Sequence, residues 1–387
     1  MGTSRYLILG GGMVAGYAAK EMIERGLKQG ELTIVSADNV VPYERPPLSK
    51  GYLAGRDSEE SIRINPEQAY ADHGIALRLR TPVASVDAKR KVLRLESGEE
   101  LGFESLVIAT GARVRTLNIP GALYLRSLDD SKRIRERAGS AKRAVVIGGG
   151  FIGMEVAAVL AQKGIATTMV LKDDRLGGRL FTAAMSQFFE NYYTTHGVQF
   201  VKQASAPEEH ARNADLVVAG IGVAPVIEPL AGSGIEVDNG VVVNEYLETA
   251  KPGIYAAGDV ANYYDTLFAK RRRVEHWDNA VSQGQHMART LMGERKPFVH
   301  VPYFFSDVFD LSYEYWGDST GSDAIVERGD MAGKSFSVWW LREGRVVAAF
   351  VMARPDEERD TAPKWIESKQ KISAERLRKA GSVGEAA

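Results

Sequence analysis

Residues 6–16 read YLILGGGMVAG, and residues 144–155 read AVVIGGGFIGME. In each stretch an apolar run typical of a β-strand leads into three consecutive glycines, and a run typical of a helix follows. A strand, a glycine turn and a helix in this order form the dinucleotide-binding pattern of doubly wound α/β folds. Because the pattern occurs twice, the sequence predicts two dinucleotide-binding folds in one chain.

The small residues in these two stretches serve two purposes. The first and third glycines allow a tight turn whose backbone N–H groups can approach a pyrophosphate, and a small residue three positions later lets the helix pack closely against the strand. These positions are Gly10, Gly12 and Ala15 in the first stretch and Gly148, Gly150 and Gly153 in the second.

An acidic residue follows the second strand of each unit. The predicted strand 32–35 is followed by Asp38, and the predicted strand 166–171 is followed by Asp173. A carboxylate at this place accepts hydrogen bonds from the ribose of a dinucleotide.

The composition excludes several other classes of protein. The chain has 387 residues, of which 44% are hydrophobic and 26% charged, so we expect two or three domains. Its 49 basic and 50 acidic residues give a net charge of −1, which is not typical of nucleic-acid binding. No apolar run approaches the ~20 residues that cross a bilayer. A strand pattern begins within the first ten residues, so we expect no targeting peptide and a cytoplasmic location.

The chain contains no cysteine. This absence excludes disulfides, thiolate zinc sites, iron–sulfur ligation by this chain and a cysteine nucleophile. We also find no histidine spacing typical of a metal site and no hydrolase nucleophile motif. Any chemistry therefore depends on a bound cofactor or on oxygen and nitrogen side chains.

Two further segments complete the pattern. Residues 249–259 read TAKPGIYAAGD, a short predicted strand that ends in Gly258 and Asp259, and residues 106–111 read LVIATG. The order of these segments and the two glycine turns along the chain resembles that of the pyridine-nucleotide-dependent flavin reductases. In that family the Gly-Asp pair binds the ribitol of FAD, and the residues that match its companion segment are Ala109, Thr110 and Gly111.

Three other runs indicate one branch of this family. They are VPYERPPLSK at 41–50, RVEHWDNA at 273–280 and PYFFSD at 302–307. They resemble the branch that contains ferredoxin and rubredoxin reductases, apoptosis-inducing factor and monodehydroascorbate reductase, and the resemblance covers nearly the whole chain. The glutathione-reductase branch has a redox-active cysteine pair where this chain has none.

The resemblance implies an architecture of two dinucleotide-binding domains and a smaller α+β C-terminal domain. The FAD domain is expected at residues 1–117 and again at 240–295, with the NAD(P)-binding domain inserted at 118–239. Residues 296–387 form the third domain, in which 335–341 and 345–350 are expected to pair as a hairpin. The tail after Pro355 is polar and ends in a predicted helix at 373–380.

The resemblance also implies catalytic roles. Lys50 corresponds to a lysine beside flavin N5 and Glu155 to the glutamate that pairs with it, since a buried lysine stays charged next to a carboxylate. Glu275 corresponds to a residue that helps to hold the nicotinamide carboxamide. His276 and Trp277 are expected beside the isoalloxazine, at the start of a helix over 278–291 whose N-terminal dipole would stabilise a reduced flavin.

Other positions are expected to bind the cofactors. Arg45 and Pro46 match residues that line the FAD pyrophosphate and the flavin edge, and Phe305 is expected to cover the flavin. The remaining matches to cofactor-binding positions of the family are Arg113, Phe151, Ile152 and Gly222.

For the coenzyme we expect NADH, with NADPH left open. A carboxylate at Asp173 would accept a hydrogen bond from a 2′-hydroxyl and repel a 2′-phosphate, whereas Lys172 and Arg175 would favour the phosphate.

The main hypothesis for the electron acceptor is a ferredoxin- or rubredoxin-like carrier, and two alternatives remain open. One is reduction of monodehydroascorbate or a quinone, but Val281 and Phe305 stand where the plant enzymes are expected to have an arginine and a tyrosine. The other is an NADH-sensing interaction protein of the apoptosis-inducing-factor type. The basic run 270–273 is interpreted as a solvated face, or alternatively as a docking surface for an acidic ferredoxin. We expect a monomer or homodimer without nucleic-acid or membrane partners.

Two connections are shorter than the resemblance leads us to expect. They are the link around 120–124 and the polar stretch after the predicted strand 198–201.

Overall fold

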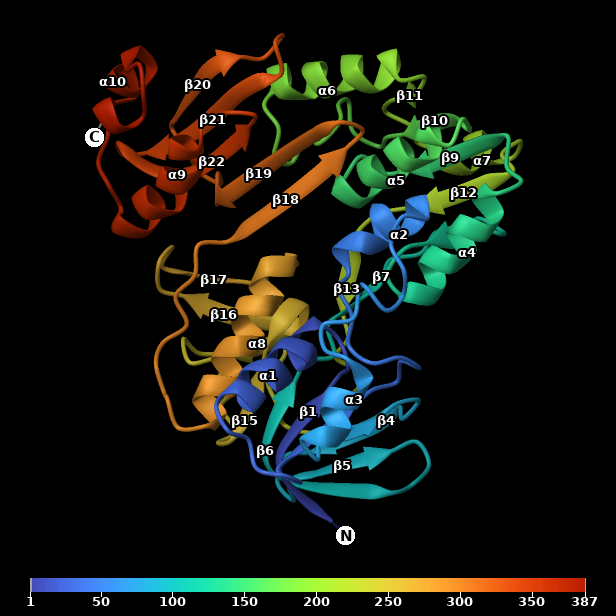
Figure 1. Ribbon diagram of the computed structural model, residues 1–387, viewed down its shortest axis with the longest axis vertical. Coiled ribbons are helices and arrows are strands. Elements are labelled where there is room, and N and C mark those ends of the chain that lie inside the picture. Colours follow the sequence, from blue (N-terminus) through green and yellow to red (C-terminus); the bar gives the residue numbers. More distant parts are fainter. Residues whose placement is uncertain (1, 387) are drawn as a thin grey trace. The chain divides into compact units, whose positions relative to one another are not determined.

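The computed structural model describes residues 2–386, which divide into two compact units (Figure 1). Unit 1 contains the N-terminal segment up to Arg45 together with Ser58–Arg113 and Val223–His300. Unit 2 contains Pro46–Asp57, Val114–Gly222 and the segment from Val301 onward. Each unit is described by itself.

Unit 1 is built on a seven-stranded sheet with the strand order β3-β2-β1-β6-β5-β4, with β15 paired to β6. The strands β1, β2, β3, β6 and β15 pair in parallel, as expected where the connections are helical crossovers. Its members are β1 (Thr3–Leu9), β2 (Leu32–Val35), β3 (Ala76–Arg78), β4 (Val83–Asp87), β5 (Val92–Leu95), β6 (Glu100–Ile108) and β15 (Ile254–Ala256).

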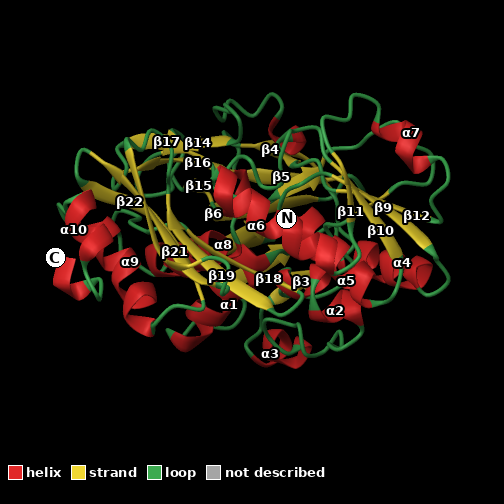
Figure 2. Cartoon of the chain, turned by 90° about the horizontal axis from the view of Figure 1, so that it is seen from above, coloured by secondary structure: helices red, strands yellow, loops and turns green. Residues whose placement is uncertain are grey.

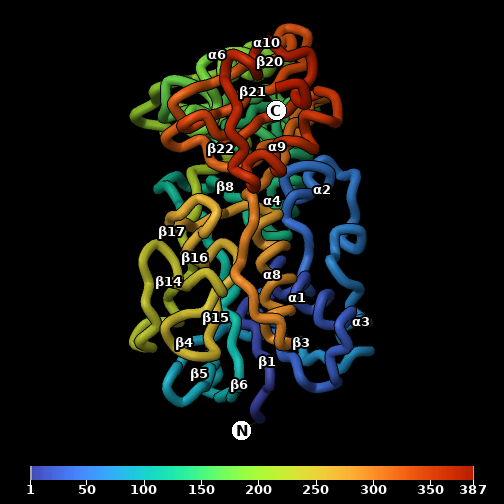
Figure 3. Tube along the Cα trace, turned by 90° about the vertical axis from the view of Figure 1, so that its left-hand side faces the viewer, coloured from blue at the N-terminus to red at the C-terminus, as the bar shows by residue number. Residues whose placement is uncertain are grey.

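Two helices of unit 1 lie side by side, α1 (Met13–Glu24) and α8 (Trp277–Leu291), as Figures 1 and 3 both show. They approach closely because Gly284 of α8 has no side chain, and a Cβ there would lie 2.7 Å from the Val14 carbonyl oxygen. A second, three-stranded sheet has the order β14-β16-β17. The remaining elements of unit 1 are α3 (Glu67–Asp72), β14 (Val241–Val243), β16 (Ala261–Asp265), β17 (Lys270–Arg272) and the short turns η2 (Glu228–Leu230) and η3 (Gly258–Val260).

The chain crosses from unit 1 to unit 2 and back at the paired strands β7 (Ala112–Val114) and β13 (Val223–Pro225).

Unit 2 contains a five-stranded sheet in the order β11-β10-β9-β12-β8, and all its pairs are parallel. Helices flank these strands, as in a dinucleotide-binding fold. The strands are β8 (Leu123–Tyr124), β9 (Arg143–Ile147), β10 (Ala166–Val170), β11 (Gln199–Val201) and β12 (Leu216–Ala219). The helices of this part are η1 (Pro46–Ser49), α2 (Gly51–Ala54), α4 (Leu128–Ala138), α5 (Phe151–Gln162), α6 (Ala183–Thr195) and α7 (Pro207–Ala211).

The other sheet of unit 2 is antiparallel, in the order β18-β19-β22-β21-β20. Its helices α9 and α10 lie beside the strands in Figure 2, with α9 against β22 and α10 against β20. The elements are β18 (Tyr303–Val308), β19 (Leu311–Gly317), β20 (Ala324–Asp330), β21 (Ser335–Arg342), β22 (Arg345–Met352), α9 (Asp356–Ser368), α10 (Ala374–Lys379) and the turn η4 (Gly384–Ala386).

The structure confirms the predicted α/β class with two dinucleotide-type folds and a smaller C-terminal sheet. The expected hairpin is β21 paired with β22, and the expected helix at 373–380 is α10, with Ser373 as its N-cap. The sequence prediction missed α9, which contains Pro363 and whose first turn is acidic. The predicted helix 278–291 begins one residue earlier, at Trp277.

Within residues 2–386, no helix combines the length and the apolar character needed to span a membrane. The same residues contain no group of three acidic, histidine or cysteine side chains placed to hold a metal ion.

Candidate active site

The first glycine turn follows β1 and is closely packed. Gly10 has a φ of +122°, and a Cβ there would lie 2.1 Å from the carbonyl oxygen of Ala109, which follows β6. No side chain other than hydrogen would fit this place. Gly12 is the N-cap of α1, and neither a side-chain cap nor an acidic residue occupies the first turn of the helix. The guanidinium of Arg45 lies nearby, 3.8 Å from where a Cβ of Gly12 would stand.

Two other segments of unit 1 are fixed around this turn. The hydroxyl of Thr110 donates to the Val226 carbonyl at 2.6 Å, and Val226 N–H donates to the Gly111 carbonyl at 3.0 Å. Asp38 accepts hydrogen bonds from the Asn39 N–H at 2.8 Å and from a tyrosine hydroxyl, that of Tyr43, at 3.2 Å.

The Gly258–Asp259 turn is held from two sides. The side-chain oxygen of Gln283 accepts the Gly258 N–H at 2.7 Å, and Arg273 donates to the Asp259 carbonyl at 3.0 Å. Gln283 is fully buried in α8. This glutamine was not among the residues predicted from the sequence, and its role depends on a contact between positions 25 residues apart.

The segment before α8 contains three predicted residues. Glu275 pairs with Arg273 at 2.6 Å, and 38% of its side chain is exposed. His276 is the N-cap of α8, and its Nδ1 is shielded from solvent. Burial, with Arg272 adding to the effect, lowers the pKa of His276 to about 4, so its ring is neutral at pH 7.

Trp277 is anchored by a glutamate that sequence reasoning missed. The indole N–H donates to one carboxylate oxygen of Glu44 at 2.6 Å, and the hydroxyl of Tyr17 donates to the other oxygen. Burial, followed by the hydrogen bond to Glu44, raises the pKa of Tyr17 above its usual value. Glu44 lies inside the run 41–50 that the sequence singled out, immediately before Arg45, so the signal was present but was not interpreted.

Two predictions about charged residues in unit 1 need comment. The interpretation of the basic run as a solvated face is wrong for Arg272 and Arg273, whose side chains are only 13% and 9% exposed. Arg272 pairs with Asp265 at 2.9 Å. Arg113 pairs at the surface with Glu228, and its binding of a cofactor stays a prediction.

The second glycine turn, in unit 2, repeats the first. Gly148 has a φ of +112°, and a Cβ there would lie 2.3 Å from the Gly220 carbonyl oxygen. A Cβ at Gly153 would lie 2.4 Å from the Gly148 carbonyl oxygen, so α5 packs against its own turn. Gly150 is the N-cap of α5 and, as in α1, has no side-chain cap.

The other predicted coenzyme residues of unit 2 are spread around α5 and β10. The ring of Phe151 packs on Phe304 at 4.4 Å between centroids, and Ile152 is 45% exposed. Asp173 is exposed after β10. Gly222 accepts the Arg115 N–H at 2.9 Å.

Lys50 and Glu155, predicted to pair, lie together in unit 2. The Lys50 ammonium is 2.9 Å from one carboxylate oxygen of Glu155 and 3.6 Å from the carboxylate of Asp307. It also lies 4.4 Å from the centre of the Phe305 ring, a favourable cation–π distance. Pro46 begins the short helical turn that leads to Lys50.

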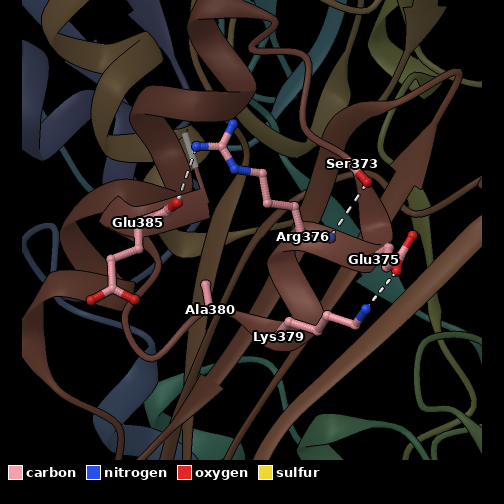
Figure 4. A pocket seen from close by; sticks show the side chains of 6 residues that line it. All are labelled: Ser373, Glu375, Arg376, Lys379, Ala380 and Glu385. Carbon is pink, nitrogen blue, oxygen red and sulfur yellow. Dashed lines mark hydrogen bonds and ion pairs between the residues drawn. The ribbon is translucent and has the colours of Figure 1, made fainter.

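A surface pocket of about 450 Å³ lies apart from all these residues, beside α10 (Figure 4). Its side chains mostly satisfy one another, as where the Lys379 ammonium donates to Glu375 at 2.6 Å. It contains none of the predicted site residues and is not the candidate active site. The residues that line it are Ser373, Glu375, Arg376, Lys379, Ala380 and Glu385.

Comparison with known proteins defines the class. Residues 4–284 match the family model described as pyridine nucleotide-disulphide oxidoreductase, and residues 303–382 match the reductase C-terminal model. The chain therefore belongs to the pyridine nucleotide-disulphide oxidoreductase family. It is an FAD-dependent NAD(P)H oxidoreductase of the ferredoxin reductase and monodehydroascorbate reductase type, as the sequence predicted.

The relatives fall into two groups. Among curated proteins, the chain is 38% identical to peroxisomal monodehydroascorbate reductase 4 of Arabidopsis thaliana, over 95% of this chain and 83% of that protein. It is 35% identical to monodehydroascorbate reductase of Pisum sativum, over 92% of this chain and 93% of that protein.

Among solved structures, the chain resembles the ferredoxin reductase for the CYP199A2 system of Rhodopseudomonas palustris. The two share 30% identity with a TM-score of 0.92, over 100% of both chains. It also resembles the reductase in a covalent putidaredoxin reductase–putidaredoxin complex, at 31% identity and a TM-score of 0.90, over 97% of this chain and 96% of that chain.

The residues present fit the two dinucleotides of this family. The helices α1 and α5 each begin at a glycine without a side-chain cap, so their first N–H groups are available to phosphate oxygens. At Gly150 a Cβ would meet nothing within 4 Å, which leaves open space in front of α5. Unit 1 would hold FAD and the second fold NAD(P)H.

Proposed function

We propose that this protein oxidises NADH and passes the electrons to a small ferredoxin- or rubredoxin-like electron carrier. The observation that supports this acceptor is the similarity to the Rhodopseudomonas palustris ferredoxin reductase along the whole of both chains. The putidaredoxin reductase, to which this chain is similar at 31% identity, was solved in a covalent complex with putidaredoxin.

Bound FAD supplies the redox chemistry, because it accepts a hydride from NAD(P)H and releases the electrons to an acceptor. The residues of this chain bind and orient the reactants. We assign FAD binding to Gly10, Gly12, Asp38, Arg45 and Asp259.

Coenzyme binding is assigned to the second glycine turn, with Asp173 as the ribose acceptor and Glu275 at the nicotinamide carboxamide. His276, Trp277 and Phe305 are assigned to the flavin surroundings. The helix α8 begins at Trp277, so the positive end of its dipole would act on a flavin bound beside that residue.

Lys50, paired with Glu155, is the proposed source of positive charge for the reduced flavin. The pair lies 2.9 Å apart, and the side chains are only 12% and 5% exposed. In a shielded place an ammonium acts more strongly on a developing negative charge than it does in water.

The proposed domain boundaries are those of the sequence: FAD domain at 1–117 and 240–295, NAD(P) domain at 118–239 and C-terminal domain at 296–387. Unit 1 and unit 2 meet along the chain at Arg113 and again at Val223, which supports the insertion. The cytoplasmic location and the monomeric or dimeric state stay predictions.

A second candidate acceptor is the monodehydroascorbate radical, because the Arabidopsis thaliana enzyme is 38% identical to this chain. Against it stand Val281, half-buried on α8, and Phe305, which offer neither a cation nor a hydroxyl to an anionic radical.

The test is a comparison of acceptors with the flavin-loaded protein and NADH. We expect kcat/KM for a plant-type or bacterial [2Fe–2S] ferredoxin, or for rubredoxin, to exceed that for enzymatically generated monodehydroascorbate by roughly tenfold or more. The Val281→Arg, Phe305→Tyr double variant should raise activity with the radical only. A higher rate with the radical in the unmodified protein would overturn the proposal. Slow reoxidation by every acceptor, with NADH-dependent dimerisation, would favour the interaction-protein alternative.

A further inference from the structure

The Glu155 carboxylate of unit 2 receives three hydrogen-bond donors, although it was expected to have one. The Lys50 ammonium donates to Oε1 at 2.9 Å, the Ser306 hydroxyl donates to Oε1 at 2.6 Å, and the Ser49 hydroxyl donates to Oε2. Glu155 is 4% exposed, Ser49 1% and Ser306 0%. The two hydroxyls are therefore shielded from solvent, and their shortest contacts are with this carboxylate, although the Ser49 hydroxyl also lies 3.4 Å from the Pro46 carbonyl oxygen.

The donors and the carboxylate that accepts their hydrogen bonds come from three separate segments of unit 2, with Lys50 directly after Ser49. Ser49 ends the turn η1, Glu155 lies in the second turn of α5, and Ser306 lies in the middle of β18. The sequence separations are 106 residues for the first contact and 151 for the second. Their convergence on one carboxylate is therefore a property of the tertiary fold.

One cation, one further carboxylate and two phenols surround Glu155. Lys50 carries the opposite charge, and Asp307 reaches the cluster through Lys50, at 3.6 Å. The phenols of Tyr193 in α6 and Tyr313 in β19 are fully buried, and burial first, with Glu155 adding to it, raises both their pKa values far above the usual range. They stay neutral and do not compete for the charge of Lys50.

The physical argument concerns a buried ion pair. Removing a carboxylate from water favours its neutral form, and one lysine alone compensates for this only in part. Hydroxyl donors stabilise the charged form of a carboxylate and fix its orientation. A carboxylate that stays charged in turn keeps its lysine protonated.

We propose that Ser49 and Ser306 are positioning residues that hold the Glu155 carboxylate in the orientation that faces Lys50, and thereby fix the place of the Lys50 ammonium. The consequence for electron transfer rests on the proposed function of Lys50. The hydrogen bonds from Ser49 and Ser306 to Glu155, which we call the clamp, rest only on contacts within unit 2.

The test measures how firmly the Lys50 ammonium is held. Trace acetylation of the flavin-loaded protein at pH 8, analysed by peptide mass spectrometry, reports the reactivity of each lysine, and an amine released from its carboxylate partner reacts faster. We expect Ser49→Ala and Ser306→Ala each to raise the acetylation rate of Lys50 severalfold relative to an exposed internal reference, Lys296. The double variant should raise it about tenfold, as should Glu155→Gln.

The matched control is Ser186→Ala. Ser186 is equally buried in unit 2, at 2% exposure, but its hydroxyl donates to a backbone carbonyl, that of Leu176, at 2.6 Å. It should lose a similar hydrogen bond without changing Lys50. Circular dichroism and thermal melting select variants that remain folded, and Ser49→Ala keeps the test available if Ser306→Ala does not fold.

The second measurement is the rate of flavin reduction by NADH between pH 6 and pH 9 in the same variants. A lower rate and an altered pH profile in the serine variants, absent in Ser186→Ala, support the clamp and its consequence. Lys50 acetylation that is unchanged in every folded serine variant overturns the clamp. Raised acetylation with unchanged flavin reduction supports the clamp but removes Lys50 from its proposed role.

Discussion

At the first glycine turn Gly10 N–H donates to the carbonyl of Val35 at 2.8 Å, and at the second Gly148 N–H donates to that of Val170 at 2.9 Å. Both glycines have a positive φ and stand against a carbonyl oxygen of the neighbouring strand end. The backbone of the two turns is therefore almost the same. The difference lies in the acids that follow.

Asp38 of the first unit is fixed before any ligand arrives. Its carboxylate accepts the hydroxyl of Tyr43, and its N–H donates to the hydroxyl of Ser36 at 3.1 Å, which in turn lies against Gly11. Asp173 of the second unit is exposed. A fixed acid suits a group that stays bound, because less conformational entropy is lost on binding, whereas an exposed acid suits a coenzyme that must leave in each cycle.

The largest expected effect separates the two turns. Gly10→Ala places a Cβ 2.1 Å from a backbone oxygen and at a strained φ. We therefore expect the free energy of unfolding to fall by several kcal/mol and the purified protein to lack flavin. Gly148→Ala creates the same steric clash and the same backbone strain in the dinucleotide fold of unit 2. We expect it to keep FAD and to lose NADH affinity by about 100-fold. Flavin-to-protein absorbance ratios and NADH titration measure both, and a colourless Gly148→Ala protein beside a yellow Gly10→Ala protein would reverse our assignment.

We expect acid to destabilise unit 1, which contains the first dinucleotide fold. Burial, with Arg272 and Arg289 respectively adding to the effect, lowers the pKa of both His276 and His286 to about 4. The unfolded chain protonates them near pH 6.5, so their contribution to stability is complete above about pH 6.5 and is lost as the pH falls toward 4.

At pH 5 we expect the loss to be on the order of 1–2 kcal/mol per histidine. Because α8 packs on α1, flavin release should accompany it. Urea unfolding of the flavin-loaded protein at pH 7 and pH 5, followed by flavin fluorescence, provides the measurement. In His286→Gln the difference between the two pH values should shrink, and an unchanged difference contradicts the assignment.

The smallest effect concerns coenzyme choice. Replacing Asp173 by serine removes the charge that would repel a 2′-phosphate, so the ratio of kcat/KM for NADPH to that for NADH should rise about tenfold. Asp174→Ser, an exposed neighbour, is the matched control and should leave the ratio unchanged. Asp38→Ser should weaken FAD retention and leave the ratio unchanged. If Asp38→Ser also raised the ratio of kcat/KM for NADPH to that for NADH, the assignment of Asp38 to FAD and of Asp173 to the coenzyme would be wrong.

The sequence predicted the glycine turns and their strands because these are local features. The strand, turn and helix at residues 6–16 have their signals within one short stretch of sequence, whereas the pairing of β1 with β6 joins segments about 100 residues apart. The Lys50–Glu155 pair could be predicted only through the resemblance to a family, because no periodicity links positions 105 residues apart.

The parts that the sequence did not predict depend on distant contacts. Ser49 and Ser306 lie within sequence runs that match the family, but no role was predicted for them, because a serine hydroxyl has no sequence pattern that reveals its hydrogen-bond partner. Gln283 could be identified only once α8 was placed against the Gly258 turn. Arg272 and Arg273 were misjudged because a basic run is usually solvated, whereas here Asp265 pairs with Arg272 and Glu275 pairs with Arg273.

The three donors on Glu155 also have a consequence for the order in which the protein can mature during translation. Ser49 and Lys50 leave the ribosome before Glu155, but Ser306 belongs to the sheet that is made last. Until that sheet folds, Glu155 lacks both the Ser306 donor and the strand β18, which packs on α5. The second dinucleotide fold therefore completes the set of donors on Glu155 only when synthesis is nearly finished, and fragments that end before β18 should leave this glutamate more exposed.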